Sequence, residues 1–478
     1  MIRTLLACVL VAWAGSLEAQ SLLQQRTASF DRDPNWESLN NRLARPVTIR
    51  QDFGYRDGKI GGVITIAGEP AYYAMKITPR TLEDTLRASG RLLCRKGTGQ
   101  AMIGFFNAST ANAWRTRNSV ALRIMGRGET FFAYEEYMTQ RWRAGSSHFT
   151  SNQKTEHIGF ATDLEHKWSF TYDPGGNGGG GTITATIDGH TTVTHLDPGH
   201  KSDGAVFDRF GVFNVMKHDD DPLEIWIDRL TINGQTVDLA KDPGWEAFQN
   251  RRKYQSRDDR PYSDYGYSNT NFAGGKAPGE IGGLIFRGDI RLPDGVNYYA
   301  DRLEVLTLER PLRASGKIIY RRGVQDSSTL IGFFNVPKST TIDPNLPRSP
   351  RSWIDYLPRC FFGVAIKGPT REGYFFHPTY RLDGDTGGGN PGNAIPNCPR
   401  LNPDDRPHDW SLEYLPDGAD GRGRIIVTLD GQSATMDLPE GHKTAGVRFN
   451  RFGIISNWVD GNGQVVYLDD LTYTAKQE

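Results

Sequence analysis

The sequence predicts an all-β protein built from short antiparallel strands, and three observations favour this class. The 478-residue chain has 54 glycines and 26 prolines, which are too many helix breakers for a helical bundle. It also contains 10 Trp, 19 Tyr and 23 Phe, residue types that are enriched in strands. Finally, apolar and polar residues alternate along several segments, which is the pattern of half-buried strands.

One region illustrates the strand, turn, strand pattern. Aromatic residues alternate with polar residues over 168–172, a glycine-rich turn follows at 173–178, and aliphatic residues alternate over 183–187. The stretch 410–431 repeats this pattern around its own turn. Alternation with a period of two on both sides of a turn predicts a β-hairpin.

The chain also repeats itself in order, which indicates an internal duplication. We therefore expect a first domain over residues 20–240 and a second, with longer loops, over 241–478. The matching segments are 33–37 with 242–246, 41–42 with 250–251, 52–55 with 264–267, 81–90 with 307–316, 103–107 with 331–335, 199–201 with 441–443, 207–211 with 449–453, and 227–231 with 468–472.

The first 19 residues have the three regions of a secretory signal. Arg3 precedes an apolar run over 5–14, and Leu17-Glu18-Ala19 supplies a small-residue cleavage site. Ten apolar residues are too few to span a bilayer, which needs about 20. We expect cleavage after Ala19, no membrane span, and a secreted, periplasmic or extracellular location.

Removal of Cys8 with the signal leaves three cysteines, an odd number for an exported protein. Cys94 lies in an expected strand and is predicted to be an inert core residue. Cys360 and Cys398 flank a loop-rich stretch that a disulfide would close, and the sequence leaves this pairing open.

The charge balance excludes one class of partner. The chain has 56 basic and 56 acidic residues, a formal net charge of +0 and a pI near 7.2. No net field attracts a polyanion, so we expect no nucleic-acid binding.

Aromatic-rich antiparallel strands and the closing segments 227–231 and 468–472 resemble the concanavalin A-like lectin/glucanase superfamily, in particular its laminin G-like jelly rolls. The resemblance covers both halves. It implies two tandem antiparallel β-sandwich domains, each with a concave sheet that binds glycans. The leading hypothesis is a secreted protein that recognises a polysaccharide. The alternatives are a glycoside hydrolase or polysaccharide lyase, and a structural protein of the cell envelope.

The longer loops of the second half favour it as the ligand site. Thirteen residues separate Tyr267 from Ile281, against four between the equivalent Tyr55 and Ile60. Insertions in one copy more often build a binding wall than add stability. Sugars bind aromatic faces and planar polar groups, so the candidate ligand-binding residues are Arg251, Tyr265, Tyr267, Lys276, Tyr299, Asn335, Trp353 and Lys443.

Whether the protein is an enzyme stays open at this level. No Glu-x-Asp-x-Glu pattern occurs, and the adjacent Glu135 and Glu136 point to opposite faces of a strand. Asp264 with Glu246 or Glu280 is the remaining hydrolytic pair.

A lyase would instead use His442 and Lys443, with Tyr267 and Arg251. The candidate catalytic residues are therefore Asp264, Glu280 and His442. Because Gly-His-Lys recurs in both halves, a shared structural role competes with this hypothesis. Asp188 and Asp430 precede glycines in tight turns, which favours a structural role for both.

The sequence suggests one metal, a structural Ca²⁺, because oxygen ligands are plentiful and no Cys/His cluster occurs. In the resembling jelly rolls, calcium joins the first strand to the last. The resemblance implies Asp33 with Asp228 in the first copy, and Asp242 with Asp469 in the second. No other cofactor is expected, and the oligomeric state is left open.

Overall fold

The computed structural model describes residues 23–111, 116–151, 156–218, 221–257, 262–289, 292, 294–324, 326–341, 352–389, 395, 397–458 and 461–476. The signal sequence expected over 1–19 lies outside these residues. Within them the chain is all-β, as predicted, with only short 3-10 turns as helical structure. No described helix is long and apolar enough to cross a membrane.

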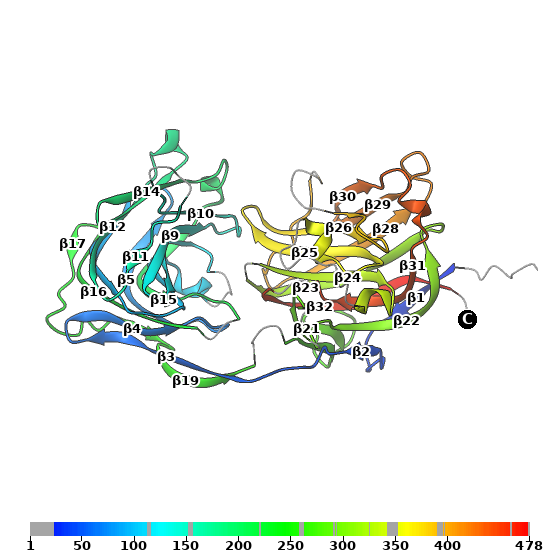
Figure 1. Cartoon of the computed structure of the whole chain (residues 1–478), viewed down its shortest axis with the longest axis horizontal. Helices are drawn as coiled ribbons and strands as arrows, with labels where there is room; N and C mark the ends of the chain where they lie inside the picture. The colour runs from blue at the N-terminus through cyan, green and yellow to red at the C-terminus, as the bar shows by residue number, and fades with distance from the viewer. Residues whose placement is uncertain are drawn as a thin grey trace, which may run out of the picture.

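The strands form four antiparallel sheets that pack as two pairs, the first sandwich and the second sandwich (Figure 1). The first sandwich consists of sheets 1 and 2. Sheet 1 contains β3 (Val47–Arg56), β4 (Lys59–Thr65), β6 (Leu86–Cys94), β12 (Glu165–Asp173), β13 (Thr182–Ile187), β14 (His190–His195), β16 (Pro222–Ile232), β17 (Gln235–Thr236) and β19 (Arg251–Ser256). Sheet 2 contains β5 (Tyr72–Thr81), β7 (Gln100–Phe106), β8 (Ser119–Arg127), β9 (Thr130–Met138), β10 (Ala144–His148), β11 (Phe160–Ala161), β15 (Val206–Asn214) and β18 (Glu246–Phe248).

The second sandwich consists of sheets 3 and 4. Sheet 3 contains β1 (Leu23–Ala28), β20 (Asp264–Ser268), β21 (Glu280–Phe286), β23 (Leu312–Gly323), β28 (Pro407–Leu415), β29 (Arg424–Leu429), β30 (Gln432–Asp437) and β32 (Gly463–Lys476). Sheet 4 contains β2 (Glu37–Leu39), β22 (Tyr298–Thr307), β24 (Ser327–Phe334), β25 (Phe361–Thr370), β26 (Gly373–Arg381), β27 (Gly387–Gly388) and β31 (Arg448–Ile455). The 3-10 turns are η1 (Ala108–Thr110), η2 (Asn177–Gly179), η3 (Lys201–Asp203), η4 (Lys338–Thr340), η5 (Trp353–Tyr356) and η6 (Lys443–Ala445).

Alternation along the strands builds each core, because successive side chains point to opposite faces. In β12, Trp168, Phe170 and Tyr172 are buried between the sheets while the residues between them are not. The predicted hairpin pairs β12 with β13. At the next turn, between β13 and β14, Asp188 accepts hydrogen bonds from the Lys167 backbone (2.8 Å) and His166 (2.6 Å).

Asp430 makes the same two contacts in the second sandwich, with the Asp409 backbone (3.0 Å) and His408 (2.6 Å). Both aspartates have a positive φ, of 46° and 47°. Their structural role in tight turns is confirmed.

The three cysteines in the described residues are buried free thiols. Cys94 is a core residue, as predicted, and burial raises the pKa of its thiol to about 12. The disulfide that the sequence left open between Cys360 and Cys398 is not formed. Burial raises the pKa of both thiols to about 11, which makes them unreactive.

The repeated opening motif of each half packs on the sandwich of the other half. Trp36 contacts Tyr299 of sheet 4, with ring centroids 5.7 Å apart, and β2 pairs with β22. Conversely, Trp245 stacks on Tyr73 of sheet 2 at 5.7 Å, and β18 pairs with β5. The two halves therefore exchange equivalent segments.

Equivalent polar contacts hold both exchanged segments. Glu37 pairs with Arg451 of sheet 4 (2.8 Å), and Glu246 pairs with Arg209 of sheet 2 (2.8 Å). A hydrogen bond from Tyr72, together with Arg209, lowers the pKa of Glu246 below its usual range. Arg209 and Arg451 are mostly buried, so the glutamate from the other half offsets the cost of burying each charge. Arg209 also contacts Asp208 of its own strand (3.3 Å).

The chain crosses between the sandwiches twice, along two strands that pair with each other. β19 runs antiparallel to β3, and Leu43 donates a backbone hydrogen bond to Ser263 (3.0 Å). Figure 1 shows this crossing below the two sandwiches. The strands of the first sandwich thus come from the continuous stretch 47–256, which lies between β2 and β20 in the sequence.

The strand pairing bears on where the boundary between the two domains lies. We expected domains over 20–240 and 241–478, and that division stays a proposal. The sheets add that β1 and β2 lie in the second sandwich, and that β18 and β19 lie in the first.

The sandwiches also contact each other directly. The tip of the β25–β26 hairpin inserts between residues of the first sandwich, where Glu372 contacts His200 (3.1 Å) and Arg143 (3.4 Å). Met216 packs in one cluster with Leu284 and Phe286. These contacts set the two sandwiches side by side.

The exchange predicts which fragment folds. A fragment of residues 46–257 should melt cooperatively, because it holds all strands of the first sandwich. A fragment of residues 20–240 lacks Trp245 and Glu246, so Arg209 loses its glutamate partner and keeps only Asp208 (3.3 Å). The lost packing and ion pair should cost about 3–5 kcal/mol of unfolding free energy. Thermal melts followed by circular dichroism, with limited proteolysis, would compare them. Equal stability of the two fragments would contradict the exchange.

Glu135 gives the first sandwich a predictable pH dependence. Its carboxyl group is buried in the core and accepts a hydrogen bond from Thr194 (2.5 Å). Burial raises its pKa to about 8. The folded state therefore holds a proton that the unfolded state releases near its ordinary pKa. This contribution to stability is complete below that value and is lost as the pH rises through about 8.

The Glu135→Gln variant should remove this dependence. Between about pH 5 and pH 8, wild-type stability should fall relative to the variant by up to about 1.4 kcal/mol per pH unit. Urea unfolding of both proteins across this range would measure the difference. A constant difference across the range would show that folding does not raise the pKa of Glu135.

Candidate functional site

Sheet 2 presents a second face, opposite the core, that carries clustered polar groups. On β9, Phe131, Ala133, Glu135 and Tyr137 point into the core. By alternation, Phe132, Tyr134 and Glu136 lie on the other face. The neighbouring strands β7 and β8 add Gln100 and Arg123 to this face.

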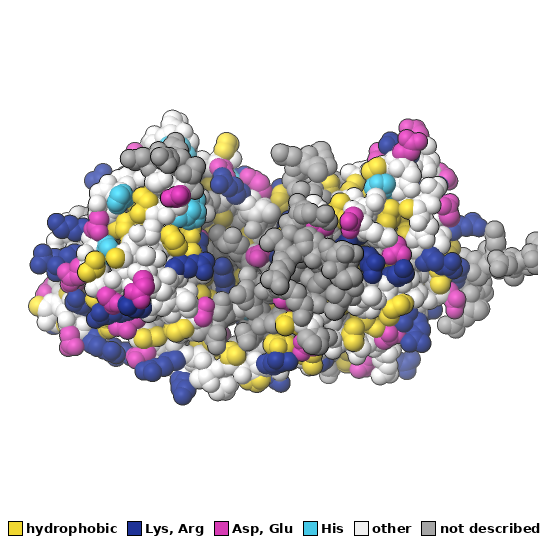
Figure 2. All heavy atoms as spheres, viewed as in Figure 1, with side chains coloured by type: hydrophobic (Ala, Val, Ile, Leu, Met, Phe, Trp, Pro, Cys, Tyr) yellow, Lys and Arg dark blue, Asp and Glu magenta, His cyan; other side chains and the backbone are white. Residues whose placement is uncertain are grey.

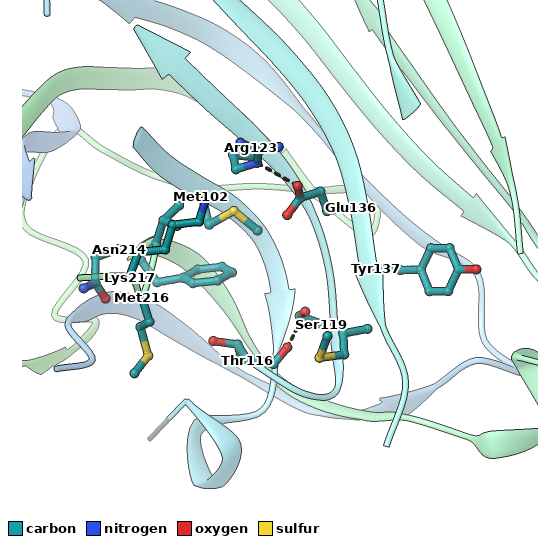
Figure 3. Close-up of a pocket in the computed structure, with 12 residues that line it drawn as sticks. Met102, Thr116, Ser119, Arg123, Glu136, Tyr137, Asn214, Met216 and Lys217 are labelled. Atoms are coloured by element: carbon teal, nitrogen blue, oxygen red, sulfur yellow. Dashed lines mark hydrogen bonds and ion pairs between the residues drawn. The ribbon is translucent and has the colours of Figure 1, made fainter. Parts of the chain in front are cut away.

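Arg123 is the centre of this cluster. Its Nε donates a hydrogen bond to Glu136 (2.7 Å), and a terminal nitrogen donates to Gln100 (2.8 Å). Its guanidinium carbon also lies 4.2 Å from the centroid of the Tyr134 ring. Both charged side chains are 14% exposed, so the pair is held in place yet remains accessible. Figure 3 shows Arg123 and Glu136 pointing toward one another.

Two histidines extend the cluster beyond Tyr134. The rings of His148 and His157 stack with centroids 3.7 Å apart, and the Tyr134 ring lies 5.9 Å from His148. Burial, and then the neighbouring His157, lower the pKa of His148. His148 is therefore a neutral imidazole at neutral pH, able to accept a proton.

A pocket opens beside this cluster, and we call it the sheet 2 groove. It has an apolar floor and a few polar groups, a composition typical of ligand sites. Its lining residues are Met102, Thr116, Ser119, Arg123, Glu136, Tyr137, Met138, Phe213, Asn214, Val215, Met216 and Lys217. The Tyr137 side chain points away from the pocket (Figure 3).

A second pocket of about 840 Å³ lies where the two sandwiches meet, and we call it the junction pocket. It shares Lys217 with the sheet 2 groove, so the two pockets adjoin. Its remaining lining comes from the second sandwich: Arg287, Asp326, Ser327, Ser328, Trp353, Lys367, Gly368, Pro369, Thr370 and Asn462. On the described surface in Figure 2, basic and acidic side chains are interspersed.

The corresponding face of sheet 4 is covered by an insertion of its own half. Trp353 of η5 donates a hydrogen bond to Thr379 (3.1 Å), and its ring lies 5.7 Å from His377. Arg381 donates to the carbonyl oxygen of Leu357 (2.8 Å) and has no exposed side-chain surface. Burial lowers the pKa of His377 to about 3, so this imidazole is neutral. The insertion therefore fills the face that sheet 2 leaves open.

The structure does not bring together the residues expected to be catalytic. Asp264 forms an ion pair with Arg42 (3.0 Å) near the surface. Glu280 is buried and accepts backbone hydrogen bonds from Phe272 (3.0 Å) and Ala273 (2.8 Å). Because Asp264 pairs with residue 284, Glu280 is four residues away along β21, roughly 13 Å.

His442, the third expected catalytic residue, is half-buried and contacts a buried tyrosine. Its Nδ1 lies 2.6 Å from the Tyr380 hydroxyl, and His200 lies 2.9 Å from Tyr137 in the first sandwich. The equivalent lysine contacts are also conserved between the halves. Lys443 donates to the Pro416 carbonyl (3.0 Å), as Lys201 does to Pro174 (3.0 Å). Both sets of contacts favour the shared structural role of Gly-His-Lys.

The expected ligand-binding residues are dispersed. Tyr265 is fully buried, with its hydroxyl on Asn297 (2.8 Å), and Tyr299 is a buried neighbour of Trp36. Asn335 donates to the Arg448 carbonyl (3.0 Å).

Three further expected residues lie elsewhere. Arg251 lies on sheet 1 and donates to the Tyr55 carbonyl (3.0 Å). The Tyr267 carbonyl accepts from Arg42 (2.6 Å), and Lys276 is exposed on its loop. Of the eight expected residues, Trp353 is the one that lines either of the two adjoining pockets.

The expected calcium ligands belong to different sandwiches. Asp242 accepts from Tyr73 of sheet 2 (2.8 Å), whereas Asp469 is buried in sheet 3. Likewise, Asp33 contacts Tyr299 of the second sandwich (3.3 Å), while Asp228 pairs with Arg91 of the first (3.0 Å). The exchange of opening segments separates each pair. The described part of the chain contains no group of three or more His, Cys, Asp or Glu suited to a metal ion.

Sequence reasoning missed the Arg123 cluster, although part of its signal was present. Tyr134 and Glu136 are two positions apart and therefore share one face of a strand. We considered Glu136 only for pairing with Glu135, which points into the core. The partners Gln100, Arg123 and His148 come from separate strands, and no local spacing links them.

Comparisons with known proteins find similarity to solved structures only. No protein-family model matches the chain, and no curated protein matches it. Among solved structures, domains LG4-5 of the mouse laminin alpha1 chain are 12% identical, covering 90% of this chain and 93% of that one, with a TM-score of 0.25. The Lotus tetragonolobus seed lectin is 15% identical over 41% of this chain and 95% of its own (TM-score 0.25).

The alginate lyase from Klebsiella pneumoniae is 13% identical over 31% of this chain and 59% of its own, with a TM-score of 0.23. Laminin G domains, lectins and alginate lyases have concanavalin-like jelly-roll folds. With TM-scores this low, we draw nothing about activity or ligand from these similarities.

Proposed function

We propose that this protein recognises a polysaccharide in the sheet 2 groove. The observation that carries the proposal is the Arg123 cluster, in which planar donors and acceptors surround an aromatic ring beside an apolar floor. Sugar rings offer apolar C–H faces and a rim of hydroxyl groups, and such a surface complements both.

The arrangement supports binding because its polar groups are held by one another. Arg123 is fixed by Glu136 and Gln100, so little side-chain freedom remains to be lost when a ligand binds. Glu136 is the one carboxylate among the described lining residues of the groove. A hydrolase that uses two carboxylic acids lacks its second acid there.

A polysaccharide lyase is the second candidate, and His148 is the observation that favours it. A lyase removes the proton next to a carboxylate group and expels the leaving sugar, which forms a double bond. The neutral His148 would accept that proton, and Tyr134 beside it would protonate the departing oxygen.

The remaining parts of the proposal rest on the sequence. Residues 1–19 are a cleaved signal, so the mature protein is exported. The internal repeat supports two tandem copies of one jelly-roll domain, of which the first keeps an open ligand face. If the protein binds no polysaccharide, a purely structural role in the cell envelope remains as the alternative.

Replacement of Tyr134 tests the binding site. The Tyr134→Ala variant should bind polysaccharide about tenfold more weakly, because it loses a ring contact of about 1–1.5 kcal/mol. Affinity gel electrophoresis against neutral and acidic polysaccharides would measure the change. Trp226→Ala is the matched control, since Trp226 also lies beside an arginine (5.6 Å) but on the outer face of sheet 1.

If polysaccharide retards the Tyr134→Ala variant and the wild type equally, the sheet 2 groove is not the binding site. Retardation of neither protein by any polysaccharide would leave the structural role. Absorbance from unsaturated products, abolished in a His148→Ala variant, would establish the lyase instead.

A further inference from the structure

The junction pocket has an excess of positive charge that the rest of the chain does not share. Among the described residues that line it, three are cationic, Lys217, Arg287 and Lys367, and one, Asp326, is a carboxylate. Over the whole chain, basic and acidic residues are equal in number. The local excess is therefore a property of this pocket, and it favours an anionic ligand.

The cations differ in their contacts. Arg287 is mostly buried and forms an ion pair with Asp326, and its guanidinium carbon lies 4.6 Å from the centroid of the Tyr356 ring. Lys367 has no ion pair within the described residues, and its Nζ lies 4.1 Å from the centroid of the Trp353 ring. The one carboxylate among the described lining residues thus pairs with Arg287, and no described carboxylate forms an ion pair with Lys367.

The surroundings of Lys367 make that charge costly. Burial, and then the Arg287 guanidinium, lower its pKa against the opposing effect of Asp326, and together they bring it to about 8. His377 on the next strand is neutral and supplies no negative charge. An anion placed beside Lys367 would gain a partly desolvated charge pair, which is stronger than one in open solvent.

The pocket is also placed to contact a chain that lies in the sheet 2 groove. Lys217 lines both pockets and comes from the first sandwich, whereas Lys367 comes from β25 of the second. A polymer bound along the groove would extend past Lys217 into the junction. The Trp353 ring stacks on the Tyr356 ring and lies against the Lys367 ammonium group, so it helps to hold that group in position.

We propose that the junction pocket binds the anionic group of an acidic sugar, a uronate carboxylate or a sulfate ester, with Lys367 and Lys217 as its contacts. This inference rests on the proposed function, since it names the class of polysaccharide. It also gives the contact between the sandwiches a role, because the ligand would touch both.

The test compares oligosaccharides that differ only in charge. Isothermal titration would use a uronic acid hexamer, its carboxyl-reduced neutral counterpart and a sulfated hexamer. The wild type should bind an anionic hexamer about tenfold more tightly than the neutral one, and added salt should reduce this preference. Whether the carboxylate or the sulfate is preferred identifies the source of the charge.

Two variants connect the preference to the pocket. Lys367→Gln should abolish the preference for the anionic hexamer while leaving binding of the neutral one unchanged. Asp326→Asn should strengthen anion binding about threefold, an increase that misfolding would not produce. Lys253→Gln, at an exposed lysine of β19, is the matched control and should bind like the wild type.

The pH provides an independent readout. Binding of the anionic hexamer should weaken between about pH 7 and about pH 9, as Lys367 loses its proton, and this loss should be absent from Lys367→Gln. Equal binding of charged and neutral hexamers would overturn this inference and leave the proposed function intact. Binding of none of the three would overturn both.

Discussion

The reciprocal exchange of opening segments is the constraint on which the rest of this structure depends. Each sandwich has a mostly buried arginine, Arg209 or Arg451, that forms an ion pair with a glutamate from the other half of the chain. Each also has a tyrosine, Tyr73 or Tyr299, that is covered by a tryptophan from the other half. Because a buried charge without its partner is costly, neither sandwich is complete without the exchange. The two crossing strands β3 and β19 pair with each other, so the connection is itself part of a sheet.

This connection explains why a pocket exists where the two sandwiches meet. The crossing strands join them along one side, and Glu372 joins them again where the β25–β26 hairpin meets His200 and Arg143. The open face of sheet 2 and the junction pocket lie in this region and share Lys217. A site composed of both sandwiches requires that they keep a fixed relation, and two separate contacts provide it.

The two copies have diverged on their equivalent faces. In the second sandwich, Trp353 and the carbonyl groups around it satisfy Thr379 and Arg381, which leaves little surface for a ligand. In the first sandwich, the corresponding strands carry Arg123 and Glu136, which satisfy each other and remain partly exposed. The longer loops of the second half therefore cover their own sheet and supply Trp353 to the junction pocket, rather than forming a separate groove.

Much of the local structure follows from the sequence by itself. Alternation along 168–172 and 183–187, the aspartates at the hairpin turns and the internal repeat determine the fold class and the hairpins, because a strand's side chains follow the period of the backbone. The sequence alone does not decide which copy of the opening motif packs on which sandwich. The motifs 33–37 and 242–246 are nearly alike and would fit either set of tyrosine and arginine partners. Only the tertiary structure decides that pairing, and with it the separation of the expected calcium ligands. It also decides that Gln100, Arg123, Glu136 and His148 meet on one face, since their proximity depends on pairing between strands that no local pattern encodes.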